Sequence, residues 1–178
     1  MKITKELLKE KGACAAGYRD FLKEYPVDKY PDGVEYQELL DCCAEKKFRY
    51  GSWLLGAFGK TDEIRKIDGD LIVEKGIIFA GWLEVKGCIE AGCGIEAGYG
   101  IEAGNGIKAG FGIKAGYNIK AGNGIEAGAG IEVGDEFGIY AGLCCRVTNK
   151  TLRKIIAKER PENIMCGEFE EKSDSEGK

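Results

Sequence analysis

A six-residue repeat runs without a gap through the middle of the 178-residue chain, from Leu71 to Glu136. Its units read LIVEKG, IIFAGW, LEVKGC, IEAGCG, IEAGYG, IEAGNG, IKAGFG, IKAGYN, IKAGNG, IEAGAG and IEVGDE. The first position is always Leu or Ile, the third is Val, Phe or Ala, and the second is charged in nine of the eleven units. This apolar–polar–apolar order is typical of a very short strand with one buried face, and the glycines that follow permit a sharp bend. Short strands joined by bends stack into a β-solenoid.

The length of one coil follows from the residues that would stack on one another. A step of 18 residues places Asn105 on Asn123 and Tyr99 on Tyr117, as in the ladders of like residues that stacked sheets form. The same step alternates the sign of charge in two columns, namely Glu90, Lys108, Glu126 and Glu96, Lys114, Glu132. A 12-residue step stacks like charges, and a 24-residue step breaks the Asn and Tyr ladders. The sequence therefore predicts a mainly β fold, a three-sided β-solenoid over residues 63–147 with three hexads in each coil.

Residues 1–62 have a helical pattern instead. Thr4 is placed to cap a first helix that runs to Lys11 and ends at Gly12. Apolar residues spaced i, i+3, i+4, i+7 predict a second helix stopped by Pro26, and a third is expected after the turn at 31–33. The residues expected to dock on the first coil are Trp53, Leu54, Leu55 and Phe58. We interpret this region as a small helical domain that caps the solenoid, because an open sheet edge invites pairing with other chains. A separate partner-binding module is the alternative.

Residues 148–169 are predicted to form a short α+β cap at the other end. We expect a short basic helix from Thr148 to Lys158 and a last strand between Asn163 and Phe169, followed by a disordered acidic tail at 170–178. The candidate phosphate-contacting residues are Arg146, Lys150, Arg153, Lys154, Lys158 and Arg160. Clustered cations of this kind can neutralise a nucleic-acid backbone. The alternative interpretation is a solvated face of the cap, with the apolar residues of the segment packed inward.

Aromatic residues recur at or near the predicted corners of the coils. The candidate partner-binding residues are Tyr99, Phe111, Tyr117, Phe137 and Tyr140. An exposed aromatic ridge would form a protein-binding strip, because aromatic side chains often anchor interfaces. By strand parity the same rings can instead point inward and fill the corners. The sequence leaves both possibilities open.

The residue types restrict the chemistry. The chain has no histidine, which excludes serine–histidine, cysteine–histidine and histidine-ligated zinc sites. The eight cysteines do not form two paired Cys-x-x-Cys knuckles and are interpreted as small apolar residues. Neither a P-loop nor a dinucleotide-binding motif occurs in the glycine-rich run. We therefore predict a protein that is not an enzyme, with no cofactor and no metal.

Charge and hydropathy indicate the cellular compartment expected for this chain. The net charge of −4 comes from well-mixed charges of both signs, so there is no global nucleic-acid footprint. The start of the chain is not a basic leader with an apolar core, and no apolar run approaches the roughly 18 residues of a membrane span. We expect a cytoplasmic protein with reduced thiols and no membrane association.

Three resemblances bear on fold and function. The strings Ile67-Asp-Gly-Asp-Leu-Ile-Val73 and Leu83-Glu-Val-Lys-Gly87 resemble bactofilin-type polymer-forming β-helices. The hexad period is similar to that of the left-handed β-helix of bacterial acyltransferases and gamma-type carbonic anhydrases, whose histidines this chain lacks. The opening Ile3-Thr-Lys-Glu-Leu-Leu-Lys-Glu-Lys-Gly-Ala-Cys14, followed by Phe21 and Tyr25-Pro26, resembles uncharacterised phage and prophage proteins of gut bacteria. The first two imply a fold, and the last implies an anti-defence role such as anti-CRISPR inhibition.

Together these observations favour a non-enzymatic, phage-type binding protein that uses a rigid solenoid surface. Its expected partner is a host protein or ribonucleoprotein complex in a bacterial cytoplasm, and its expected state is a monomer or small homo-oligomer. Two alternatives come from other classes of protein. One is a self-assembling structural scaffold, and the other is a nucleic-acid-binding accessory protein that acts through residues 146–160.

Overall fold

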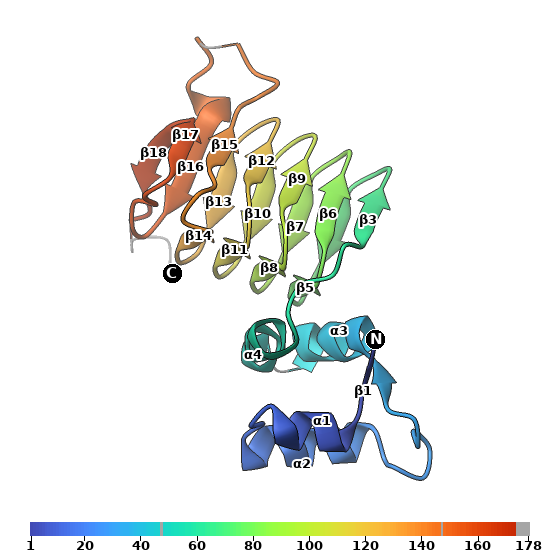
Figure 1. Cartoon of the computed structure of the whole chain (residues 1–178). Coiled ribbons are helices and arrows are strands. Elements are labelled where there is room, and N and C mark those ends of the chain that lie inside the picture. The colour runs from blue at the N-terminus through green and yellow to red at the C-terminus, as the bar shows by residue number, and fades with distance from the viewer. Residues whose placement is uncertain (47, 147, 174–178) are drawn as a thin grey trace.

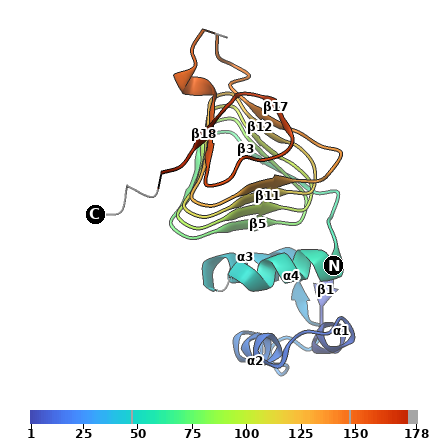
Figure 2. The same ribbon diagram turned by 90° about the vertical axis from the view of Figure 1, so that its left-hand side faces the viewer.

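The computed structural model describes residues 1–46, 48–146 and 148–173. A helical domain comes first in the chain, and a β-solenoid follows it (Figure 1). The solenoid has three sides when viewed along its length, and the helical domain lies against only one of them (Figure 2). The predicted mainly β fold is therefore confirmed.

The helical domain begins as the sequence predicts. Its elements are β1 (Lys2–Ile3), α1 (Lys5–Glu10), α2 (Ala15–Glu24), β2 (Val34–Glu35), α3 (Tyr36–Lys46) and α4 (Phe48–Phe58). The Thr4 hydroxyl accepts a hydrogen bond from the Leu7 N–H at 3.3 Å, which satisfies one of the free donors of the first turn of α1. Gly12 follows this helix with a φ of 78°, the left-handed conformation that glycine adopts most easily. Val34, expected in the third helix, instead lies in β2, which pairs antiparallel with β1.

Parallel strands form the three sides of the solenoid. The first side contains β3 (Ile64–Ile67), β6 (Trp82–Val85), β9 (Ile101–Ala103), β12 (Ile119–Ala121), β15 (Ile139–Ala141) and β17 (Ile164–Cys166). The second contains β4 (Leu71–Val73), β7 (Ile89–Ala91), β10 (Ile107–Ala109), β13 (Ile125–Ala127), β16 (Lys154–Ala157) and β18 (Glu168–Glu171). The third contains β5 (Ile77–Phe79), β8 (Ile95–Ala97), β11 (Ile113–Ala115) and β14 (Ile131–Val133).

The register confirms the predicted 18-residue coil. Ile107 pairs with Ile89 on one side and with Ile125 on the other, so the first-position side chains stack into columns inside the prism. Isoleucines at this position in β7 to β14 are at most 4% exposed, and the alanines two residues later are equally buried in all but β14, which has a valine there. The charged residues between them point outward. Lys114 and Glu132 are one such pair, with an Nζ–Oε2 distance of 3.1 Å.

The C-terminal part differs from the sequence-based prediction. The expected basic helix is wrong, because the chain forms only a 3₁₀ turn at Thr151–Arg153 and then enters the strand β16. Ile155 pairs with Ile125, and Phe169 pairs with Ile155, so the stacking continues past the predicted end at residue 147. Glu170 and Glu171, which we expected in a disordered tail, belong to β18. Residues 174–178 of that predicted tail lie outside the described residues.

The helical domain packs on the outside of β5 rather than over the open end of the first coil. Ile78, whose side chain points outward from β5, is 1% exposed and shares an apolar cluster with Leu40 and Leu54. Trp53, Leu55 and Phe58 pack against the same cluster, as expected. The edges of β3 and β4 each have a paired strand on one side only. The domain therefore covers one side of the solenoid and leaves most of its first coil open.

Candidate binding surfaces

The predicted aromatic ridge divides into separate groups. Tyr99 and Tyr117 stack with ring centroids 4.9 Å apart, and Phe137 meets Tyr117 edge-on at 4.0 Å. Trp82, which was not among the predicted partner-binding residues, is stacked against both tyrosines. These four rings form a ladder at the corner between the third and first sides. Phe111 and Tyr140 do not belong to it.

The corner ladder is a structural element that is covered in part by the segment between α4 and β3. The Lys60 ammonium lies 4.4 Å and 4.1 Å from the ring centroids of Tyr99 and Tyr117, in a cation–π arrangement. The Tyr99 hydroxyl donates to Asp62 Oδ1 at 3.1 Å, and this hydrogen bond raises the pKa of Tyr99. All four rings of the ladder are half-buried. Their contacts hold the linker of the helical domain against the solenoid.

Phe111 has different surroundings at the corner between the second and third sides. Its corner neighbours in the adjacent coils are Cys93 and Ala129, whose small side chains leave the ring uncovered. The Phe111 side chain is 64% exposed. It is thus a large apolar group held outside the solenoid by a backbone that is hydrogen-bonded to both adjacent coils. A large aromatic ring held on a fixed backbone can serve as an interface anchor.

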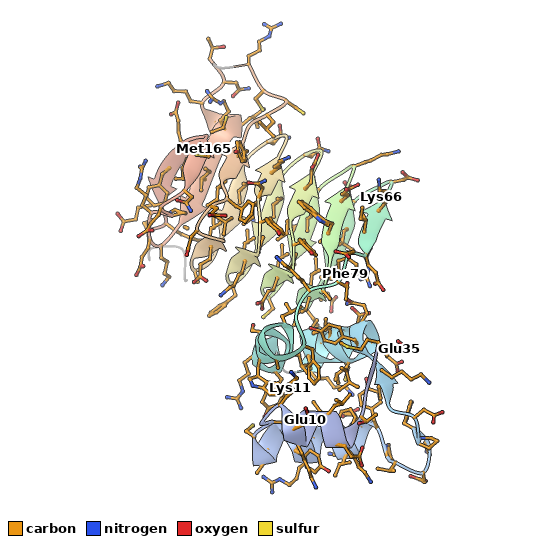
Figure 3. All side chains as sticks on the ribbon, in the orientation of Figure 1. Glu10, Lys11, Glu35, Lys66, Phe79 and Met165 are labelled. Atoms are coloured by element: carbon orange, nitrogen blue, oxygen red, sulfur yellow. The ribbon has the colours of Figure 1, made fainter. Side chains whose placement is uncertain are left out.

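Tyr140 lies on the outer face of the first side, in β15. Its ring is half-buried, and both it and Met165 of β17 border the space beside Gly138. Met165 is 66% exposed near the C-terminal end of the solenoid, whereas Lys66 marks the first coil (Figure 3). Tyr140 and Met165 form a second, smaller apolar surface.

Two of the six candidate phosphate-contacting residues, Lys150 and Lys154, face glutamates. Lys154 forms an ion pair with Glu170, and Lys150 approaches Glu168 at 4.0 Å. Arg160 lies 5.7 Å from the ring of Phe169. Arg153 donates to Cys166 Sγ at 3.7 Å, whereas Arg146 and Lys158 are exposed. Because β18 brings glutamates alongside β16, part of the positive charge of the segment is compensated within the chain.

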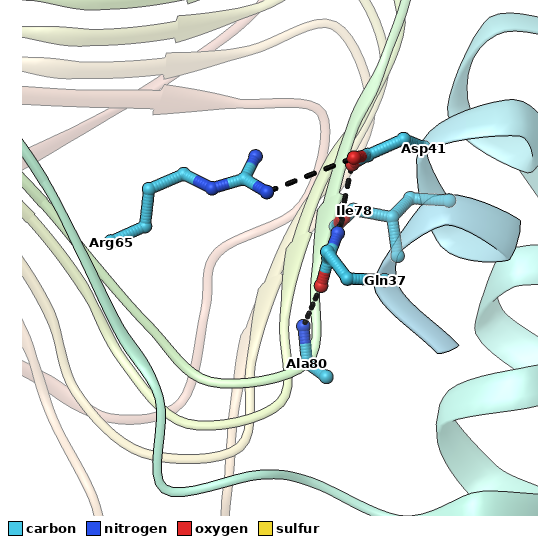
Figure 4. A network of polar contacts seen from close by, with 5 residues as sticks. All are labelled: Gln37, Asp41, Arg65, Ile78 and Ala80. Carbon is cyan, nitrogen blue, oxygen red and sulfur yellow. Dashed lines mark hydrogen bonds and ion pairs between the residues drawn. The ribbon is translucent and has the colours of Figure 1, made fainter. Parts of the chain in front are cut away.

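A polar network lies at the edge of the first coil, beside β5 (Figure 4). Gln37 of α3 donates to the Ile78 carbonyl at 2.8 Å and accepts from the Ala80 N–H at 3.1 Å, so it occupies the free edge of β5. Gln37 also donates to Asp41, whose carboxylate lies 3.7 Å from the Arg65 guanidinium. Arg65 pairs with the inward-facing Leu83, and its guanidinium lies 4.6 Å from the ring of the buried Phe79. A charged side chain thus covers the core at this end.

Charged side chains also lie at the exposed edge of the last coil, as they do at the first. Arg160 lies over Phe169, which occupies an inward register position opposite Ile155. Glu171 stands opposite the buried Ala157 in the register, and its charged side chain is exposed at this end of the solenoid. Lys172 bonds Glu126 at 2.8 Å, and this contact holds the end of the strand and lowers the pKa of Glu126. Charged side chains at sheet edges discourage pairing with another chain.

The cysteines differ in exposure, and this difference gives a testable prediction. Burial raises the pKa of the Cys43 thiol to about 12, whereas Cys14 and Cys144 are exposed. We expect Cys43 to react with a charged disulfide reagent at least about tenfold more slowly than Cys144 at pH ~8, because the Cys43 thiol is buried and only the thiolate is nucleophilic. Mass spectrometry of the labelled peptides over time measures both rates. Comparable rates for the two thiols would contradict the burial of Cys43.

The described residues contain no cluster of three or more cysteine, aspartate or glutamate side chains placed to hold a metal ion. Among the same residues, no helix has the length and apolar character needed to cross a membrane. The fold defines the chain as a three-sided β-solenoid protein with a helical domain attached to one side. No protein-family model matches this chain, and no curated protein or solved structure matches it. Its function must therefore be argued from its own surfaces.

Proposed function

We propose that this chain is a non-enzymatic binding protein that engages a macromolecular partner through the side of its solenoid, with Phe111 as the anchor residue. The observation that carries this proposal is the 64% exposure of a phenylalanine on a rigid repeat, between two small corner neighbours in the adjacent coils, Cys93 and Ala129. An exposed ring contributes no burial to the fold, whereas a partner that covers it removes its apolar surface from water. Its fixed backbone lowers the entropy that is lost on binding.

The charged and polar residues at both ends of the solenoid favour partner binding by its lateral faces. Arg65 and Gln37 occupy the first coil, and Glu171 and Arg160 occupy the last. These charged and polar groups disfavour the coil-on-coil growth that a polymerising scaffold requires. The acidic strand β18 likewise disfavours phosphate binding by the segment from 146 to 160. We therefore retain neither the scaffold nor the nucleic-acid accessory protein as a second candidate.

The class of partner follows from the resemblance of the N-terminal region to phage and prophage proteins. We propose a host protein or ribonucleoprotein complex of a bacterial cytoplasm, and a defence complex such as a CRISPR effector is the case to test first. Binding there would block a surface that the complex needs, so the outcome is inhibition without chemistry. The partner surface would be an apolar recess large enough for one phenyl ring.

A pair of variants tests this proposal. Phe111→Glu is expected to weaken binding to a purified partner by about 30-fold or more, because the loss of a buried aromatic anchor is a hot-spot effect. Ile72→Glu is the matched control, since Ile72 is also 64% exposed but lies on the second side of the solenoid. The tagged wild-type protein first isolates a stoichiometric complex from a gut-bacterial lysate, and calorimetry then compares the three proteins.

The outcomes separate clearly. A partner lost by Phe111→Glu and kept by Ile72→Glu supports the proposal. Equal affinity of the two variants, or the recovery of no stoichiometric partner, would overturn it. Circular dichroism confirms beforehand that both variants keep the wild-type fold.

A further inference from the structure

The helical domain contains an apolar cavity that no part of the proposed function uses. Its volume is about 270 Å³, and residues of all four helices line it. The lining side chains that matter most are Leu8, Phe21, Tyr25, Tyr50, Trp53 and Leu54. Four of these are aromatic, and the burial of Tyr25 raises the pKa of its hydroxyl. The cavity is therefore a largely apolar, ring-lined space within a small domain, and it is partly open to solvent.

A glycine inside a helix keeps this cavity open. Gly17 lies in the first turn of α2 and lines the cavity. A Cβ at this position would stand 3.5 Å from Cys14 Sγ and 3.8 Å from the Tyr50 ring, which are ordinary contacts. Its φ is not left-handed, so the backbone does not require glycine. Glycine weakens a helix relative to alanine. Glycine at position 17 therefore makes α2 less stable than alanine would, and it leaves free the space that a side chain would fill.

The charges around the cavity indicate an uncharged ligand. Asp20, Lys23, Glu24 and Lys46 contribute two charges of each sign, and Lys46 forms an ion pair with Glu24. No net charge is left over to recognise an anion or a cation. The volume is nearly twice the roughly 150 Å³ of an apolar cavity known to accept benzene. Aromatic walls favour offset or edge-on contacts with another ring.

From this geometry we propose that the cavity between the helices binds an uncharged aromatic molecule of about two rings. The ligand would lie among the rings of Phe21, Tyr25 and Trp53, and the space beside Gly17 would admit its second ring. This site is independent of Phe111, which lies on the solenoid. Failure of either proposal therefore leaves the other intact.

The probe is N-phenyl-1-naphthylamine, an uncharged dye whose emission increases in apolar surroundings. The wild-type chain is expected to bind one dye per chain in a saturable titration, and naphthalene should displace it. Gly17→Leu places a side chain in the cavity and should weaken binding at least tenfold while the helix becomes no less stable. Gly56→Leu is the matched control. Gly56 is also inside a helix, but it does not line the cavity, and a Cβ there would meet no atom within 4 Å.

A second measurement does not depend on the folding of a variant. In methyl NMR spectra of the wild-type chain, naphthalene should shift the signals of Leu8 and Leu54 and leave the solenoid residues Ile101 and Ile119 unchanged. Saturable binding that Gly17→Leu weakens and Gly56→Leu preserves, with these shifts, supports the site. Absence of saturable binding, equal binding by both variants, or shifts spread over the solenoid would overturn it.

Discussion

Replacement of Gly110 with alanine is expected to destabilise the solenoid by about 3 kcal/mol, at the upper end of overpacking effects. Gly110 follows β10 and turns the chain at a corner. A Cβ added there would lie 2.2 Å from the carbonyl oxygen of Gly92 in the adjacent coil. Backbone cannot yield as a flexible side chain can, so the two coils must separate locally. Their separation would weaken the hydrogen bond from the Gly110 N–H to the Ala91 carbonyl, now 2.9 Å.

The control for this substitution is Gly130→Ala. Gly130 is also a corner glycine of the repeat, but a Cβ there would meet no atom within 4 Å. We expect its free energy of unfolding to change by less than about 0.5 kcal/mol. Urea denaturation followed by circular dichroism compares the two variants with the wild-type chain. Equal stability of the variants would show that close approach of the coils does not explain these glycines.

The length of one coil could be predicted from the sequence because the solenoid is a regular repeat. The side chain at each hexad position meets the same position in the next coil, so local pattern and long-range contact carry the same information. The stacking of Asn105 on Asn123, together with the Tyr pair and the alternating charges, selects 18 residues as the coil length, and these two asparagines are indeed adjacent across the coils. Few folds offer this equivalence between sequence distance and spatial neighbours.

The C-terminal strands show where that equivalence ends. Ile155 and Ala157 repeat the Ile-x-Ala pattern of the hexads, but a long excursion after β15 displaces them from the 18-residue step. Without the step, the clustered cations suggested an exposed helix. Pairing with β13 overrides that local preference, because the strand buries Ile155 and Ala157 completely. The pattern itself was the signal that could have identified β16.

The surfaces were less accessible to prediction than the fold. The step of 18 residues correctly stacks Tyr99 on Tyr117. Trp82 holds the sixth position of its hexad rather than the fifth, and its ring stacks with the two tyrosines because it lies in the space beside Gly100. Arg65 could have been placed, since the same step sets it opposite the inward Leu83. The attachment of the helical domain to the side of β5 had no comparable signal. It depends on the three-dimensional fit of helices to a sheet.

Ile78→Glu is expected to detach the helical domain while the solenoid persists. Ile78 occupies the outward second position of its hexad, and Glu96 follows in the next coil, so glutamate at this position fits the repeat. The Ile78 side chain, however, is 1% exposed and contacts α4 at Gly51, where a Cβ would lie 2.1 Å from Ile78 Cδ1. A carboxylate there would be buried without a cationic partner, beside the buried Glu96. We expect the helical domain to lose about 4 kcal/mol of stability.

Hydrogen exchange read by mass spectrometry distinguishes the two parts of the chain. Protection of α3 and α4 should fall by about a thousandfold, the factor that 4 kcal/mol implies, whereas β9 to β13 should keep their protection. Ile72→Glu is the matched control, because Ile72 holds the same hexad position beside Glu90 but is 64% exposed. Its exchange should match the wild-type chain throughout. If Ile78→Glu instead released the helices and the repeats together, the first coils would depend on the helical domain for their stability. The domain would then be part of the solenoid fold rather than a unit attached to its side.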